Sequence, residues 1–367
     1  MRKIIIMEAV VLAVLLVIAL ALTLKGPEDD RTLQAQPVST EQTIPSTDSQ
    51  TSAPPADTQP VPTTEPTAYT EPTEPPTEPP TEPTEPFEMP EITWKTFPER
   101  QQVSAARAFV YDCQSESYIY TKGDPTEKLY IASITKLFAI DTAHPWLDPG
   151  EEIRVTSGPL SQYPPAASLA GLQSGDVLTV SQLYGCILLP SGNDAAYVMA
   201  TAVGKKVAND PELSTTDAVK AFVEEMNRHA GELGLKNTHF ENPVGFHSET
   251  HYTCFDDLVT ISQRTLENES VMQYTNLPKV TVTPVTGREK KLENTNALVN
   301  PNSSYYCPYA IGLKTGHTIA AEYCLLSVFD IDGRQYIIGV FGCPGYYGRY
   351  SDSLLLFNTK VILQDTQ

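Results

Sequence analysis

A serine and a lysine lie three residues apart in the segment S-I-T-K at 133–136, within a run of apolar and helix-forming residues. On a helix, positions i and i+3 lie on one face, so the amine of Lys136 can reach the hydroxyl of Ser133. A serine hydroxyl is a weak nucleophile until a base removes its proton, and lysine is such a base only where burial or another cation keeps it neutral. The spacing predicts a nucleophile, Ser133, beside its base, Lys136. Alone, S-x-x-K is equally typical of an ordinary amphipathic helix.

Two further motifs follow along the chain, S-G-N at 191–193 and K-T-G at 314–316. Each alone is compatible with an ordinary turn or the end of a strand. The order S-x-x-K, S-x-N, K-T-G is the signature of penicillin-binding proteins and class A β-lactamases. The three motifs together therefore indicate a serine enzyme that forms an acyl-enzyme.

The residues around these motifs carry a narrower resemblance. The runs LLPSGNDAA at 188–196, ELGLKNTHFENPV at 232–244, HYT at 251–253 and GLKTGHT at 312–318 resemble the low-molecular-weight D-alanyl-D-alanine carboxypeptidases of serine peptidase family S11. The resemblance spans residues 100–360. It implies a β-lactamase/DD-peptidase-like α/β (α+β) fold, with an antiparallel sheet flanked by helices and a mostly helical lobe. It also implies no cofactor and two partners, a peptidoglycan stem peptide ending in D-Ala-D-Ala and β-lactam antibiotics.

The resemblance assigns a catalytic role to three side chains. Ser133 would attack the substrate carbonyl, Lys136 would accept the serine proton, and Ser191 would relay a proton to the leaving amine. Lys136 needs a nearby cation and a dry pocket to act at neutral pH, and Lys314 is the expected cation.

The remaining motif residues are expected to bind substrate. By resemblance, Asn193 orients the substrate amide and Lys136, and the backbone N–H groups of Ser133 and His317 form the oxyanion hole. Lys314 and Thr315 offer a charge and a hydroxyl donor that suit a terminal carboxylate. Gly316 has no Cβ, so a substrate strand can approach its backbone closely.

Two alternative functions stay open at this stage. A β-lactamase must also hydrolyse its acyl-enzyme quickly, usually with a positioned glutamate and a water. No glutamate between 191 and 314 has a matching E-x-x-x-N context, since Asn268 follows Glu267 directly. A penicillin-binding sensor that is acylated without turnover would keep all three motifs.

Two positions depart from the family pattern. Ile131 stands where proline often precedes Ala-Ser, and Glu322 follows two alanines where glycine is common. The first should alter only how the chain enters the helix. The second places a charge near the strand expected to flank the substrate.

The first 25 residues predict a membrane segment. Arg2 and Lys3 precede an apolar run interrupted by Glu8, and basic residues on this side send the downstream chain out of the cytoplasm. The run is long for a signal peptide and slightly short for a comfortable span, so both an anchor and a cleaved leader fit; we favour the anchor. The expected location is the extracytoplasmic face of a bacterial cell membrane, within the cell envelope, or outside the cell as a secreted protein if the leader is cleaved.

Residues 26–92 predict a disordered linker rather than a domain, because they are rich in Pro, Thr and Glu and contain few residues that could form a core. Of the formal net charge of −20, fourteen acids against the single Arg31 lie between positions 26 and 91. The predicted catalytic domain, 93–367, is thus only mildly acidic, which argues against nucleic-acid binding.

Cysteine and histidine patterns suggest neither a disulfide framework nor a metal site. The six cysteines show no C-x-x-C spacing, and Cys186 and Cys324 lie in apolar runs that suit buried thiols. His247 and His251 flank Glu249, but the order is not H-E-x-x-H and the preceding residues read as a loop.

Periodicity predicts the elements that must position these residues. A capping box of Thr179 and Gln182 should start the helix over 180–189, which leaves Ser191 and Asn193 on a loop, and Asp332-Gly333 should close a hairpin. Strands are predicted over 106–112, 117–121, 309–314, 323–329 and 335–341, and further helices from Ser133 onward and over 351–363.

Overall fold

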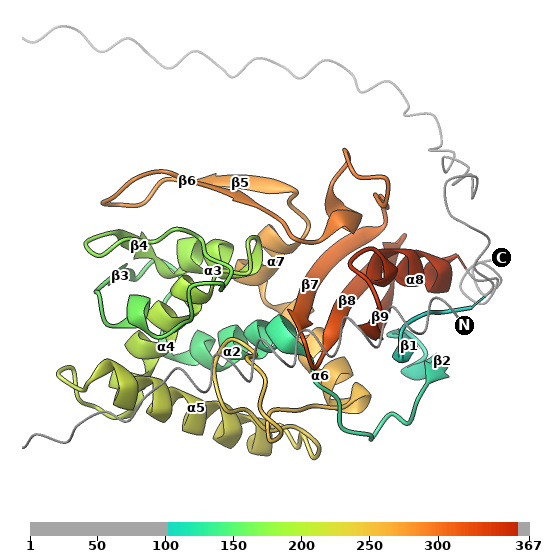
Figure 1. Cartoon of the computed structure of the whole chain (residues 1–367), viewed down its shortest axis with the longest axis horizontal. Helices are drawn as coiled ribbons and strands as arrows, with labels where there is room; N and C mark the ends of the chain where they lie inside the picture. The colour runs from blue at the N-terminus through green and yellow to red at the C-terminus, as the bar shows by residue number, and fades with distance from the viewer. Residues whose placement is uncertain (1–101, 359–367) are drawn as a thin grey trace, which may run out of the picture. The chain divides into compact units, whose positions relative to one another are not determined.

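The computed structural model describes residues 102–358, which belong to one compact unit spanning Pro86–Gln367 (Figure 1). The predictions for segments 1–25 and 26–92, and for the end of the last helix beyond 358, lie outside the described residues.

An antiparallel sheet of five strands forms the centre of this unit, in the order β2-β1-β9-β8-β7. The strands are β1 (Arg107–Asp112), β2 (Ser117–Lys122), β7 (Ala310–Thr318), β8 (Glu322–Ile331) and β9 (Arg334–Cys343). The predicted hairpin is confirmed, since Ile331 pairs with Arg334 across Asp332-Gly333. The order leaves β7, which carries K-T-G, at one edge of the sheet.

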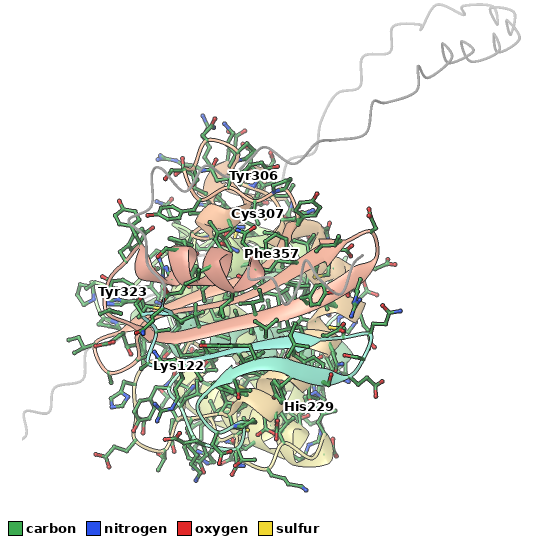
Figure 2. The ribbon with its side chains drawn as sticks, turned by 90° about the vertical axis from the view of Figure 1, so that its right-hand side faces the viewer. Lys122, His229, Tyr306, Cys307, Tyr323 and Phe357 are labelled. Atoms are coloured by element: carbon green, nitrogen blue, oxygen red, sulfur yellow. The ribbon has the colours of Figure 1, made fainter. Side chains whose placement is uncertain are left out.

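The strands alternate their side chains between two cores, as the period of two requires. Phe109, Leu326 and Ile337 face the larger core, which also includes the helical lobe. Val110, Leu325 and Ile338 face the smaller core under α8 (Gly348–Phe357). Figure 2 shows α8 lying along the strands, where Phe357 stacks on Phe329 with ring centroids 4.4 Å apart. The sheet therefore has a buried layer on both faces.

The second lobe is mostly helical and packs around α2 (Thr135–Ala143), every residue of which is buried. Helix α2 contacts α3, α4, α5 and α6. The further helices are α3 (Val180–Leu188), α4 (Asn193–Val207), α5 (Thr215–Glu232), α6 (Phe255–Glu267) and α7 (Glu269–Thr275). Two small antiparallel sheets of two strands each complete it: β3 (Glu152–Arg154) with β4 (Val177–Thr179), and β5 (Lys279–Val282) with β6 (Lys290–Glu293). The predicted sheet between helices and the helical lobe are confirmed.

Local differences from the predicted elements have simple causes. Ser133 lies in a short 3₁₀ turn, η2 (Ala132–Ile134), and α2 begins two residues later. Strand β7 runs on to Thr318 because it pairs with β8 throughout, so K-T-G lies within the strand. The predicted capping box of Thr179 and Gln182 is confirmed at the start of α3.

Candidate active site

The 3₁₀ turn η2 presents Ser133 to its lysine. The Nζ of Lys136, on the first turn of α2, lies 2.9 Å from the Oγ of Ser133, which confirms the predicted contact. Ala132, just before the serine, has a φ of +49°, in the left-handed region that L residues rarely adopt. Such backbone strain clusters at functional sites, where the surrounding packing holds it.

The environment of Lys136 favours the neutral amine. The side chain is completely buried, and Nζ also lies 3.0 Å from the carbonyl oxygen of Val244. Burial, and then the charge of Lys314, hold the pKa of Lys136 well below its ordinary value, while Asp194 acts in the opposite direction. The prediction that Lys314 is the nearby cation is confirmed. Lys136 can therefore accept a proton from Ser133.

Lys314 is itself buried, and its Nζ donates to the backbone carbonyl of Thr315 at 3.1 Å. Burial, followed by the charge of Arg349, lowers the pKa of Lys314 to about 7. The Lys314 side chain is not among the residues that line the pocket described below.

The S-G-N segment lies between α3 and α4. Ser191 has a φ of +61°, and Asn193 is the first residue of α4 rather than part of a loop. The Oγ of Ser191 and the Oδ1 of Asn193 are buried and have no hydrogen-bond partner among the described residues. A buried polar atom without a partner costs free energy, so both atoms are suited to bond a substrate.

Asp194 ties the S-G-N segment to the facing wall of the site. Its carboxylate, completely buried, accepts hydrogen bonds from the backbone N–H groups of Ala170, Gly171 and Leu172. The loop just before these residues reaches the pocket through Ala166, Ala167 and Ser168.

On the other side of the serine lies the edge strand β7. Thr315 has its Oγ1 2.6 Å from that of Thr295. A Cβ on Gly316 would come within 2.5 Å of the carbonyl oxygen of Ile131, so this glycine lets β7 pack against the turn that carries Ser133. From the sequence, we expected a substrate strand to use the space left by the missing Cβ of Gly316. In the structure, the backbone of Ile131 occupies that space.

These segments enclose a cavity of about 410 Å³. The predicted site residues on its wall are Ser133, Ser191, Asn193, Thr315, Gly316 and His317. Ser168, Val244, Phe246, Thr295, Tyr323, Tyr346 and Arg349 are also among the lining residues. The three motifs, far apart in the sequence, thus meet at one pocket, with the two lysines behind its surface.

Arg349 is a lining residue that the sequence reasoning missed. It lies on α8, its guanidinium packs 4.5 Å from the ring centre of Tyr346, and it donates to the carbonyl of Gly316 at 3.3 Å. Its Nε is buried without a hydrogen-bond partner among the described residues. Among the described lining residues, it carries the one permanent positive charge. No local pattern around position 349 signals this role.

The two departures from the family pattern each have a backbone consequence. Glu322 begins β8 at a φ of +52°, a conformation that glycine adopts without strain. Ile131 has a φ of −116°, which a proline ring does not allow.

The two histidines that flank Glu249 contact other side chains, and the cysteines are unpaired with one another. His251 lies 2.8 Å from the Oγ1 of Thr135, and His247 packs edge-on against Tyr130. All six cysteines, which lie within residues 102–358, are free thiols. Within these same residues no cluster of three potential metal ligands is found, and no helix combines the length and hydropathy needed to cross a membrane.

Comparison with known proteins places this site in a family. A family model for D-alanyl-D-alanine carboxypeptidases, Peptidase_S11, matches residues 94–345. The D-alanyl-D-alanine carboxypeptidase DacF of Bacillus subtilis is 31% identical over 242 residues, covering 65% of this chain and 57% of that protein. A D-alanyl-D-alanine carboxypeptidase of Streptomyces sp. is 32% identical over 196 residues, covering 52% of this chain and 64% of that protein. The chain thus matches between half and two thirds of the length of these curated relatives.

Solved structures agree in fold. The crystal structure of a Streptomyces DD-transpeptidase superposes with a TM-score of 0.61 at 26% identity, covering 70% of this chain and 97% of that one. Penicillin-binding protein D2 of Listeria monocytogenes, in its ampicillin-bound form, gives a TM-score of 0.56 at 24% identity, covering 72% and 99%. The DD-peptidase-like fold is therefore confirmed. With the three motifs at one pocket and the family model over most of the chain, this protein belongs to the S11 D-alanyl-D-alanine carboxypeptidase family.

Proposed function

We propose that this chain is a serine-type D-Ala-D-Ala carboxypeptidase, which removes the terminal D-alanine from peptidoglycan stem peptides and is acylated by β-lactams at the same serine. The observation that carries the proposal is the buried Lys136, 2.9 Å from the Oγ of Ser133 at the wall of a polar pocket. Family membership supports the choice of substrate.

The first step is acylation. As Ser133 attacks the carbonyl carbon of the D-Ala-D-Ala bond, its proton passes to neutral Lys136. The backbone N–H groups of Ser133 and His317 are proposed to bond the developing oxyanion. Ser191, whose Oγ has no partner among the described residues, is proposed to pass the proton to the leaving D-alanine. Asn193 is proposed to accept a hydrogen bond from the substrate amide through its Oδ1, which has no partner among the described residues.

An exopeptidase must bind the terminal carboxylate of its peptide substrate. Arg349 supplies the positive charge on the wall of the pocket, and Thr315 supplies a hydroxyl donor beside it. Lys314 lies on β7 behind the pocket surface, and the charge that it carries when protonated lowers the pKa of Lys136. The part of the peptide that precedes the scissile bond would then lie along the edge strand β7.

The two alternative functions receive less support. A β-lactamase usually positions a glutamate and a water over its acyl-enzyme, but the described residues that line the pocket include neither aspartate nor glutamate. Glu267, at the end of α6, is not among them. A non-turnover sensor differs from the proposed enzyme in deacylation, so kinetics distinguish the two.

We further propose that the N-terminal segment 1–25 holds the protein at the extracytoplasmic face of the cell membrane, with the linker 26–92 carrying the catalytic domain toward the wall. The basic residues ahead of the apolar run and the Pro/Thr/Glu-rich composition support this arrangement.

The test of the function is an assay of released D-alanine, with the full chain in detergent and a peptide ending in D-Ala-D-Ala. The proposal predicts repeated turnover by the native chain and none by Ser133→Ala. A persistent penicillin adduct without D-alanine release would favour a sensor, and rapid penicillin hydrolysis without D-alanine release would favour a β-lactamase.

A further inference from the structure

The second hydrogen-bonding contact of Lys136 bears on how the lysine works as a base. A neutral amine has two N–H groups and one lone pair. The carbonyl of Val244, 3.0 Å from Nζ, accepts one N–H. With that N–H directed at Val244, rotation of the amine is restricted and the lone pair can be directed at Ser133, 2.9 Å away. The position of this carbonyl therefore decides whether the lysine can receive the serine proton.

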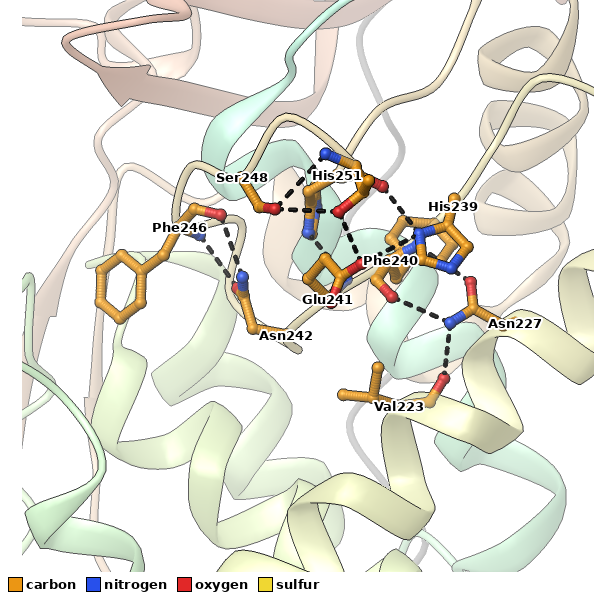
Figure 3. Close-up of polar contacts among 10 residues, drawn as sticks. Val223, Asn227, His239, Phe240, Glu241, Asn242, Phe246, Ser248 and His251 are labelled. Atoms are coloured by element: carbon orange, nitrogen blue, oxygen red, sulfur yellow. Dashed lines mark hydrogen bonds and ion pairs between the residues drawn. The ribbon is translucent and has the colours of Figure 1, made fainter.

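The side chain of Asn242 fixes that carbonyl. Its Oδ1 accepts hydrogen bonds from the backbone N–H groups of Val244, Gly245 and Phe246, at 3.2, 2.8 and 2.9 Å. Its Nδ2 donates to the carbonyl of Phe246 at 2.9 Å, so the amide closes both ends of the turn (Figure 3). These four bonds hold a turn that contains no regular helix or strand.

The turn is seated directly on the segment that carries the nucleophile. Gly245 has a φ of +88°, and a Cβ there would overlap the carbonyl oxygen of Ala132. Beside it, the Nδ1 of His251 accepts from the backbone N–H of Glu241 at 3.2 Å, so its Nε2 carries the proton and donates to the Oγ1 of Thr135 at 2.8 Å. The 242–246 turn and the S-I-T-K segment thus form one packed unit.

We propose that Asn242 is a positioning residue for the general base, which acts by holding the Val244 carbonyl against the amine of Lys136. The proposal rests on the proposed function, because it concerns the acylation step of that reaction. It gives Asn242 a role in the reaction beyond closing the turn.

Asn227 offers a matched control in the same region. Its side chain also bonds backbone groups, donating to Val223 and Phe240 and accepting from the N–H of Phe240 (Figure 3). It therefore supports the segment that leads into the turn without contacting the turn itself. Asn242→Ala and Asn227→Ala each remove an amide that bonds the backbone, but only the first releases the Val244 carbonyl.

The measurement is the second-order rate constant for acylation of the full chain by a labelled penicillin, as a function of pH. We expect Asn242→Ala to lower the plateau rate by about 10- to 100-fold, because a misplaced base is poorly aligned with its proton. Asn227→Ala should stay within about threefold of the native plateau, whatever its loss of thermal stability.

The acid limb of the pH profile is the range in which the acylation rate falls as Lys136 becomes protonated. A purely structural role of Asn242 would leave the position of this limb unchanged. Lys314 and Asp194 are the charged groups that act on Lys136, and both are untouched by the substitution. Burial is the largest cause of the low pKa of Lys136, so a loosened turn that admits water should raise this pKa. The acid limb should then move to higher pH in Asn242→Ala but not in Asn227→Ala.

Equal plateau losses in the two variants, with the acid limb unmoved, would overturn the proposal. If Asn242→Ala does not fold, Asn242→Asp carries the test, because it keeps the three accepting contacts. It replaces the donor that faces the Phe246 carbonyl by a carboxylate oxygen, whose charge should act on the acid limb rather than on the plateau. Its plateau should lie within about threefold of the native one, and a folded Asp variant with a tenfold loss would contradict the proposal. Failure of the native chain to be acylated would instead refute the proposed function.

Discussion

The surroundings of Lys136 favour the neutral amine that its proposed role as a base requires. The amine is fully buried, and the charge of Lys314 disfavours a second positive charge. Because the charged form is penalised twice, the neutral form exists at a pH where a lysine in water is an ammonium ion. The acid limb of acylation should therefore lie well below the ordinary pKa of lysine.

Replacing Lys314 by methionine should move this acid limb. The substitution removes the repulsion that helps to lower the pKa of Lys136, so that pKa rises and the rate begins to fall at a higher pH, by on the order of one pH unit. The measurement is the pH profile of penicillin acylation. Lys122→Met, which removes a lysine that donates to Val103 and Ala105 elsewhere, should leave the limb in place. An unmoved limb in the Lys314 variant would contradict the account.

Replacing Arg349 by leucine should remove the preference for a free carboxylate. Loss of a charge-assisted hydrogen bond should lower kcat/KM for a peptide ending in D-Ala-D-Ala by about 10- to 100-fold. The same peptide with an amidated end should change by less than about threefold, since it has no charge to lose. Equal losses on both peptides would show that Arg349 acts on something other than the carboxylate.

For individual residues, the sequence predicts the contact between Ser133 and Lys136 and the cation that acts on this lysine, but not the whole pocket. The contact between Ser133 and Lys136 follows from a spacing of three residues, which local geometry determines. The position of Arg349 depends on how α8 packs across the sheet, and no local pattern contains that information. From the sequence, Lys314 and Thr315 were expected to bind the terminal carboxylate of the substrate. The pocket wall instead contains Thr315 and Arg349.

Among the elements, the loop after α5 and helix α2 are joined by a buried histidine whose charge state should control stability. Burial lowers the pKa of His251 to about 4, so the fold holds the neutral ring while the unfolded chain takes up a proton near pH 6.5. A lowered pKa in the folded state gives a stability that is complete above the unfolded value and is lost as the pH falls toward 4.

The free energy of unfolding should thus fall by about 3 kcal/mol between roughly pH 6.5 and 4 because of this group. His251→Gln should flatten that part of the curve, measured by denaturant titration at several pH values. His144→Gln changes an exposed histidine and should leave the slope as it is. A native slope retained in His251→Gln would show that other groups cause the pH dependence.

Element boundaries were predictable where a local signal sets them. The capping box at Thr179 places the start of α3, and Asp332-Gly333 places the β8–β9 turn. The start of α2 was not predictable, because it depends on packing between Ile131 and Gly316. The end of β7 was not predictable either, because it depends on pairing with β8.

For the whole molecule, the compact unit Pro86–Gln367 contains all the residues that line the pocket. A chain starting at Pro86 should therefore cleave a soluble D-Ala-D-Ala peptide with kcat/KM within about twofold of the full chain, since no described contact of the site is removed. Assays of the two chains in the same detergent make the comparison. A loss of tenfold or more would mean that the first 85 residues contribute to the site.

Ser133 is proposed to form an acyl-enzyme with Lys136 as its base. The most direct measurement is the intact mass of the full chain after brief mixing with penicillin, followed by peptide mapping of the adduct. We expect one adduct, on Ser133, that forms at neutral pH, clears slowly and is absent from the folded Ser133→Ala variant. An adduct on another residue, or one that persists in Ser133→Ala, would contradict it.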